Sequence, residues 1–204
     1  MMTRIAPFSR LTLALALCAI PLAPALAHTG SGVQEGVLSG FLHPLLGPDH
    51  LVAMVAVGLW GAQLGNPAIW VLPITFPLVM AVGGLLGISG IDIPFVEPLI
   101  AISGIALGMM VALNVRPPLW AAAILVGVFA VFHGYAHGQE LPEAADAVAY
   151  AVGFVVATGM LHLLGILIGV LVRWEAGAAA VRACGAAIGC VGFYFLLGAV
   201  GIIA

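Results

Sequence analysis

The 204-residue chain is 64% hydrophobic and only 6% charged, whereas soluble globular domains carry about 25% charged residues. This composition excludes a soluble domain and indicates an all-α integral membrane protein. The formal net charge is −3, with five basic residues in total. We therefore expect a lipid bilayer as the surroundings and no nucleic-acid partner.

Residues 1–27 have the features of a cleavable secretory signal peptide. Arg4 and Arg10 are followed by an apolar stretch at residues 11–20 and by Ala-Leu-Ala at residues 25–27, which matches the order of charged, apolar and small-residue regions in such signals. The alternative is an additional transmembrane helix, but its apolar part is about half of the roughly 20 residues that a span needs. Cleavage after Ala27 would leave His28 as the mature amino terminus and residues 28–204 as one transmembrane domain.

The mature chain contains apolar segments for a six-transmembrane-helix bundle. Each segment is long enough to cross about 30 Å of hydrocarbon, and the first is long enough to be broken in the middle. Small residues four apart, such as Gly104 with Gly108 and Gly185 with Gly189, indicate close helix packing. The predicted spans are residues 33–64, 67–89, 95–114, 117–137, 146–172 and 178–204.

The distribution of arginines predicts the orientation. If a secretory signal places residue 28 in the periplasm, then Arg116, Arg173 and Arg182 all fall in cytoplasmic loops, as the positive-inside rule expects. Both termini of the mature chain are then periplasmic in a bacterial inner membrane. The acidic connections at residues 92–97 and 140–146 also face the periplasm.

The first polar motif interrupts the first apolar segment and reads His-Pro-Leu-Leu-Gly-Pro-Asp-His over residues 43–50. Its prolines predict a broken helix, which can direct side chains into a cavity, as in many transporters. Ionisable groups within a membrane segment indicate a functional site, so His43, Asp49 and His50 are candidate metal ligands. The alternative is a kinked helix with histidines that only form hydrogen bonds.

A second polar motif, at the outer end of the fourth span, contains His133, His137 and Glu140. Their spacing of four and three residues places them on one helical face, where they are further candidate ligands; the alternative is a polar cluster at the membrane surface. His162, in the fifth span, is a candidate for the same pathway, although a single membrane histidine often only bonds a neighbouring helix. Since all these ligands are nitrogen or oxygen donors, they favour a borderline divalent ion such as nickel, cobalt, zinc or ferrous iron.

Residues 43–60, together with residues 133–140 and His162, resemble the motifs of the HupE/UreJ family of nickel permeases. The resemblance covers essentially the whole chain, including the signal peptide. It implies a secondary permease for nickel, or for cobalt, that supplies hydrogenase or urease maturation, without a prosthetic group and with a cytoplasmic metallochaperone as a partner.

Two functions follow as expectations. In the first, His28 and the face of residues 133–140 take the ion at the periplasmic mouth, and the ligands of residues 43–50 hold it further in. No Walker A sequence is present, so the membrane potential, an ion gradient or a cytoplasmic sink would drive uptake. The alternative is a membrane-embedded metalloenzyme in which the same residues hold a catalytic ion.

Overall fold

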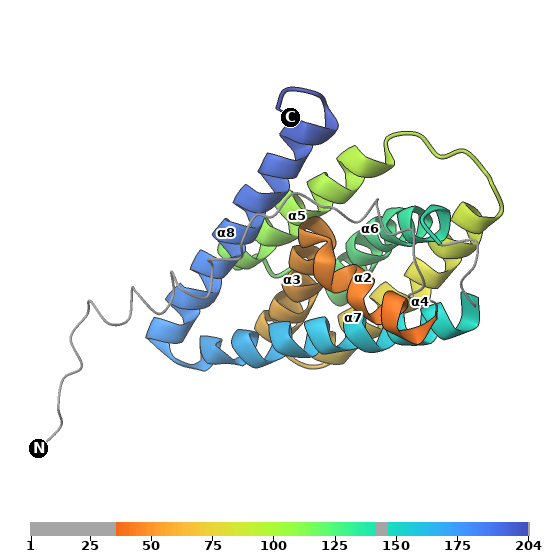
Figure 1. The fold of residues 1–204 in the computed structure, drawn as a ribbon. Helices are drawn as coiled ribbons and strands as arrows, with labels where there is room; N and C mark the ends of the chain where they lie inside the picture. Colours follow the sequence, from red (N-terminus) through yellow and green to blue (C-terminus); the bar gives the residue numbers. More distant parts are fainter. Residues whose placement is uncertain (1–35, 142–146, 204) are drawn as a thin grey trace, which may run out of the picture.

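The computed structural model describes residues 36–141 and 147–203, and these residues fold entirely into helices and their connections (Figure 1). The predicted signal peptide and His28 lie outside the described residues. The elements are α2 (Val37–Leu46), α3 (Pro48–Leu64), α4 (Ala68–Ile88), α5 (Val96–Ala112), α6 (Leu119–Gln139), α7 (Ala147–Gly169), the short 3₁₀ helix η1 (Val170–Arg173) and α8 (Glu175–Ala199).

Within the described part of the chain, α4, α6, α7 with η1, and α8 are each long and apolar enough to cross a membrane. A fifth span results if α2 and α3 are counted as one broken span. The sixth predicted span corresponds to α5, which is apolar but has only 17 residues. At 1.5 Å per residue it measures about 26 Å, slightly less than a typical hydrocarbon core. The all-helical membrane fold is therefore confirmed. Five of the six predicted spans are long enough to cross a membrane, if α2 and α3 are counted as one span, and the predicted span at α5 is shorter.

The predicted break in the first span is present. Helices α2 and α3 are bent by 84° at a single residue, Gly47, which has an extended backbone conformation. Pro48 starts α3 at a position where its missing N–H costs nothing, and Pro44 lies inside α2 and removes one helical hydrogen bond. The two prolines and the glycine therefore account for the break that the sequence predicts.

Helix α3 lies at the centre of the bundle (Figure 1). It contacts α4, α5, α7 and α8, and most of its residues are buried. The Trp60 indole donates a hydrogen bond to the Val115 carbonyl, and the Gln63 side chain donates one to the Val111 carbonyl. These two bonds attach the C-terminal end of α3 to the C-terminal end of α5 and to the connection that follows it.

Close contacts between helix backbones fix the direction of each pair. Helices α4 and α6 run in parallel, because Gly83 faces the Val131 carbonyl and Gly87 faces the Tyr135 carbonyl. A Cβ atom on either glycine would overlap the facing carbonyl. The parallel contact places the polar end of α6 beside the C-terminal end of α4.

Two further pairs complete the arrangement. Helix α3 runs parallel to α7, and helix α5 runs antiparallel to α8, where Gly104 faces Gly192 and Gly108 faces Gly189. The predicted small-residue positions on α5 and α8 therefore do lie in a helix contact.

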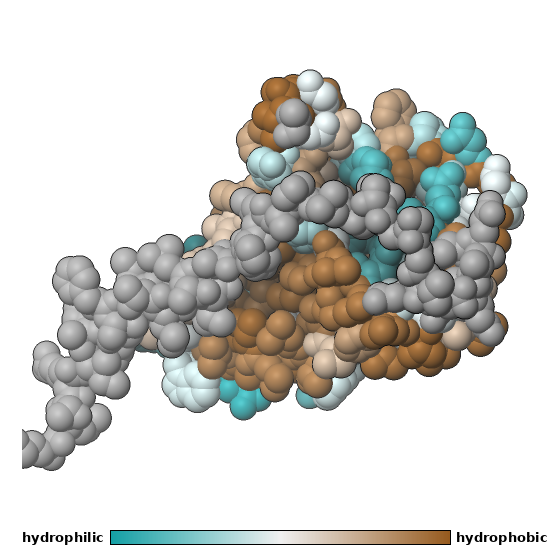
Figure 2. All heavy atoms as spheres, in the orientation of Figure 1, coloured by the Kyte–Doolittle hydropathy of each residue, from teal (hydrophilic) through white to brown (hydrophobic). Residues whose placement is uncertain are grey.

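Large apolar side chains remain exposed on the outer surfaces of these helices, including Leu78, Trp120, Val148 and Leu167. Figure 2 shows hydrophobic residues over the face that α2 and α7 form, and hydrophilic residues gathered toward the connection between α4 and α5. An apolar outside around a core that contains polar groups is the distribution expected in a bilayer.

Candidate metal centre

The first group of candidate ligands lies where α2 meets the end of α6. The Nε2 atom of His43 is 3.1 Å from the Oε2 atom of Glu140, and the rings of His43 and His137 are 4.8 Å apart between centres. One potential ligand atom from each of these three residues lies within 4.8 Å of the other two. We call His43, His137 and Glu140 the outer cluster.

Local geometry explains how the outer cluster forms. Gly40 faces the backbone of Tyr150, and Gly153 faces Val37, so α2 packs directly on α7. His43 follows Gly40 by three residues and therefore projects beside the contact. His137 is in the last turn of α6 and Glu140 caps that helix, so the (i, i+3) spacing brings both to the same side.

His50 continues the group toward the interior. Its ring centre is 4.4 Å from that of His137 and 4.8 Å from that of His133. His50, His133 and His137 are all buried. The four histidines at positions 43, 50, 133 and 137 thus form a continuous series of ring contacts across α2, α3 and α6.

Asp49 binds His50. Its Oδ1 atom accepts a hydrogen bond from Nδ1 of His50 at 3.0 Å and one from the His50 backbone N–H at 2.9 Å. A carboxylate that holds the second ring nitrogen of a metal-binding histidine orients that ring and increases its basicity. The structure therefore gives Asp49 an orienting contact, with its oxygen directed at His50.

His162 lies apart from the other histidines. The Phe76 ring stands between His162 and His133, with centres 5.5 Å and 5.4 Å away respectively. The structure thus brings together His43, Asp49, His50, His133, His137 and Glu140, while His162 is one aromatic ring further in. His28 lies outside the described residues.

Several residues around the histidines were not predicted from the sequence. Phe154 of α7 contacts the His137 ring at 4.4 Å, and Tyr150 contacts the His43 ring at 6.0 Å. Ser103 of α5 bonds to His133. Aromatic and serine residues are ordinary in apolar helices, so their spacing alone carries no signal for a metal site.

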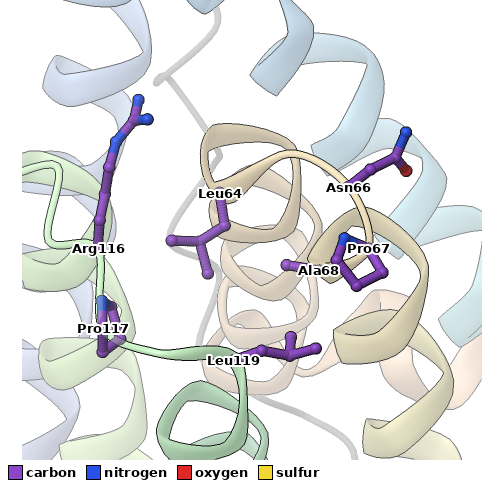
Figure 3. Close-up of a pocket in the computed structure, with 7 residues that line it drawn as sticks. All are labelled: Leu64, Asn66, Pro67, Ala68, Arg116, Pro117 and Leu119. Atoms are coloured by element: carbon purple, nitrogen blue, oxygen red, sulfur yellow. The ribbon is translucent and has the colours of Figure 1, made fainter.

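A separate small cavity of about 160 Å³ lies between the α3–α4 and α5–α6 connections (Figure 3). Leu64, Pro67 and Leu119 line it, and Arg116 stands at its side. Its lining contains no histidine or acidic residue. The cavity is therefore distinct from the histidine cluster.

Comparison with known proteins identifies the family. The sequence model described as HupE / UreJ protein matches residues 15–195. The chain belongs to the HupE/UreJ family. It is 44% identical over 192 residues to Protein HupE of Rhizobium leguminosarum bv. viciae, and the match covers 94% of this chain and 99% of that protein. No solved structure matches the chain.

Family membership confirms the resemblance drawn from residues 43–60 and 133–140, and agrees with a multi-pass membrane protein. In this HupE/UreJ protein the polar motifs of the first and fourth predicted spans meet at one site. Imidazole nitrogens with a single carboxylate form a donor set suited to borderline first-row divalent ions.

Proposed function

We propose that this protein is a secondary permease that imports a divalent transition-metal ion across the bacterial inner membrane. Nickel is the favoured substrate and cobalt the second choice, as the HupE/UreJ family implies. The observation that carries the proposal is the outer cluster, three candidate ligands within 4.8 Å that come from α2 and from the end of α6. The cluster lies at one end of a series of buried histidines in an apolar bundle.

The outer cluster would take the ion from water first. His43 and Glu140 retain partial solvent exposure, with side-chain exposed fractions of 21% and 32%, whereas His133 is fully buried. An ion bound by His43, His137 and Glu140 would exchange solvent for protein ligands stepwise, which lowers the cost of dehydration. His50, His133 and then His162 would follow along the path, and His28 would act at the mouth.

Helix directions support six crossings. If the chain crosses the membrane at each of α3, α4, α5, α6, α7 and α8, alternate helices must run in the same direction. The parallel contacts of α3 with α7 and of α4 with α6, and the antiparallel contact of α5 with α8, all agree with this alternation. We therefore count α5 as a span despite its length, and we assign α2, which is bent by 84° from α3, to the first span.

The orientation follows from the charges. The connections that carry Arg116 and Arg173 lie at one end of the bundle, and Glu97 and Glu140 lie at the other. The positive-inside rule then makes the arginine end cytoplasmic. The signal peptide at residues 1–27 and periplasmic termini belong to the same proposal.

The membrane potential can supply the driving force. A divalent cation that moves inward gains about 4.6 kcal/mol per 100 mV, at about 2.3 kcal/mol for each charge. A cytoplasmic metallochaperone that serves hydrogenase or urease maturation would keep the free ion concentration low inside. No prosthetic group is needed for this mechanism.

Transport by the purified full-length protein in liposomes that enclose a metal-sensitive dye tests the proposal. We expect nickel to enter the liposomes faster when the membrane potential is negative inside. Cobalt should compete with nickel for entry, and His137→Ala should abolish it. Cys190→Ala, on an exposed position of α8, is the matched control and should transport normally. Tight metal binding without any entry would contradict the permease and favour a metalloenzyme.

A further inference from the structure

Ser103 of α5 has a buried hydroxyl group that makes two hydrogen bonds. Its oxygen is 2.6 Å from the Ile100 carbonyl and 2.8 Å from Nε2 of His133. A carbonyl can only accept, so the single hydroxyl proton is donated to Ile100. The oxygen must then accept the second bond, and His133 must donate it from Nε2.

This arrangement selects the tautomer of His133. In a neutral imidazole only one nitrogen carries a proton, so a proton on Nε2 leaves Nδ1 with a free lone pair. The Nδ1 atom is buried and has no hydrogen-bond partner among the described residues. A buried imidazole nitrogen with a free lone pair is the form in which histidine binds a metal ion.

His50 is prepared in the complementary way. Asp49 accepts the proton of its Nδ1 atom, so the lone pair is on Nε2. That nitrogen is likewise buried and without a hydrogen-bond partner in the described part of the chain. Each histidine therefore has one nitrogen fixed by a neighbouring oxygen and the other available.

The spacing of the rings fits ligands of one ion. With metal–nitrogen bonds of about 2.1 Å, two imidazoles on a tetrahedral or octahedral ion have ring centres about 4.5 to 5 Å apart. The His50 and His133 centres are 4.8 Å apart, and those of His50 and His137 are 4.4 Å apart. The first separation is in this range, and the second is just below it.

We propose that His50 and His133 form an inner station for the transported divalent ion, distinct from the outer cluster, and that Ser103 is the positioning residue that presents Nδ1 of His133. His137 contacts the rings of both His43 and His50, so it serves both stations, and the ion moves inward without losing all of its imidazole ligands. This inference rests on the proposed function, because the ion is its substrate.

The test measures nickel binding by equilibrium dialysis of the purified full-length protein in two backgrounds. Removing the outer cluster with His43→Ala and Glu140→Ala should leave a nickel site, and adding Ser103→Ala should weaken that site by about 10- to 100-fold, as for other residues that orient a ligand. In a His50→Ala background, where only the outer cluster remains, Ser103→Ala should leave nickel affinity unchanged. Ser89→Ala is the control, since Ser89 makes the same kind of bond to a preceding carbonyl.

A spectroscopic measurement on the wild-type protein keeps the proposal testable if a variant does not fold. The ¹⁵N NMR signals of metal-free, histidine-labelled protein should show His133 protonated on Nε2, and nickel should shift or broaden its Nδ1 signal. Protonation of Nδ1 instead would overturn the proposal. So would a loss from Ser103→Ala that is equal in both backgrounds, or no loss in either.

These results are separable from a failure of the proposed function. If wild-type protein transports nickel but the protein without the outer cluster binds none, the inner station is excluded and the permease remains. If wild-type protein neither binds nor transports nickel or cobalt, the proposed function fails, and the inner station for that substrate fails with it.

Discussion

Asp49 provides a quantitative test of whether an acidic residue in the first motif orients a ligand or binds the ion directly. Its Oδ1 atom accepts two hydrogen bonds, both from His50, at 2.9 and 3.0 Å. Asp49→Asn keeps an acceptor oxygen in this position and removes the charge. Asp49→Ala removes the acceptor as well.

The expected losses differ between the two variants. A hydrogen bond to a charged group contributes about 1.5–3 kcal/mol, against about 0.5–1.5 kcal/mol for a neutral one. Asp49→Asn should therefore cost about 1.4 kcal/mol, or about tenfold in nickel affinity. Asp49→Ala leaves the Nδ1 proton of a buried ring without its acceptor and should cost up to about 100-fold.

The assay is the nickel dependence of the initial uptake rate in proteoliposomes, together with nickel binding by the same preparations. Asp92→Asn, an exposed acidic residue on the connection between α4 and α5, is the control and should differ little from wild type. If Asp49→Asn abolishes binding as completely as Asp49→Ala, the carboxylate is itself a ligand and the orienting role is refuted. Wild-type affinity in both variants would refute any role in the site.

Three further predictions follow from the helix contacts, the topology and the ligand type. Gly138→Ala should destabilise the fold by about 1–3 kcal/mol in thermal unfolding, because its Cβ would overlap the Gly84 carbonyl. Gly198→Ala is the control and should not destabilise the fold, because its Cβ would meet nothing within 4 Å. Equal stability of the two variants would contradict the close α4–α6 contact. A reporter that is active only in the periplasm should be active when fused after Ala204 and silent when inserted beside Arg116, and the reverse pattern would overturn the proposed direction of transport. Protons compete with metal ions for neutral imidazole, whose ordinary pKa is about 6.5, so apparent nickel affinity should fall between about pH 7 and pH 5.5 and uptake should recover at saturating nickel; constant affinity over this interval would favour carboxylates as the principal ligands.

Local sequence signals predicted those parts of the fold that depend on neighbouring residues. The bend between α2 and α3 follows from Pro44, Gly47 and Pro48, which lie within five residues. The pairing of His137 with Glu140 follows from helical spacing alone. Each prediction needed only backbone geometry, which acts over one or two turns of helix.

The contacts that assemble the site depend instead on which helices are neighbours, and the sequence does not determine this. Residues 133, 137 and 140 were expected to form one wall, yet His137 and Glu140 contact His43, while His133 contacts His50 and Ser103. Ser103 and His133 are 30 positions apart, and a single serine in an apolar helix gives no sign of its partner. Close packing of glycines on α4 and α6 aligns these two helices. The chain has 27 glycines, so the sequence alone does not indicate which glycines form a helix contact.

The inner end of the histidine series meets a part of α4 that has lost backbone hydrogen bonds. Pro73 and Pro77 both lie inside this helix. Because Pro77 has no N–H, the Pro73 carbonyl has no helical donor. Phe76, which separates His133 from His162, is in the same turn. Any movement of the Phe76 ring and its backbone therefore breaks fewer hydrogen bonds here than in an uninterrupted helix, and in the proposed permease this turn of α4 is the candidate segment for opening between His133 and His162.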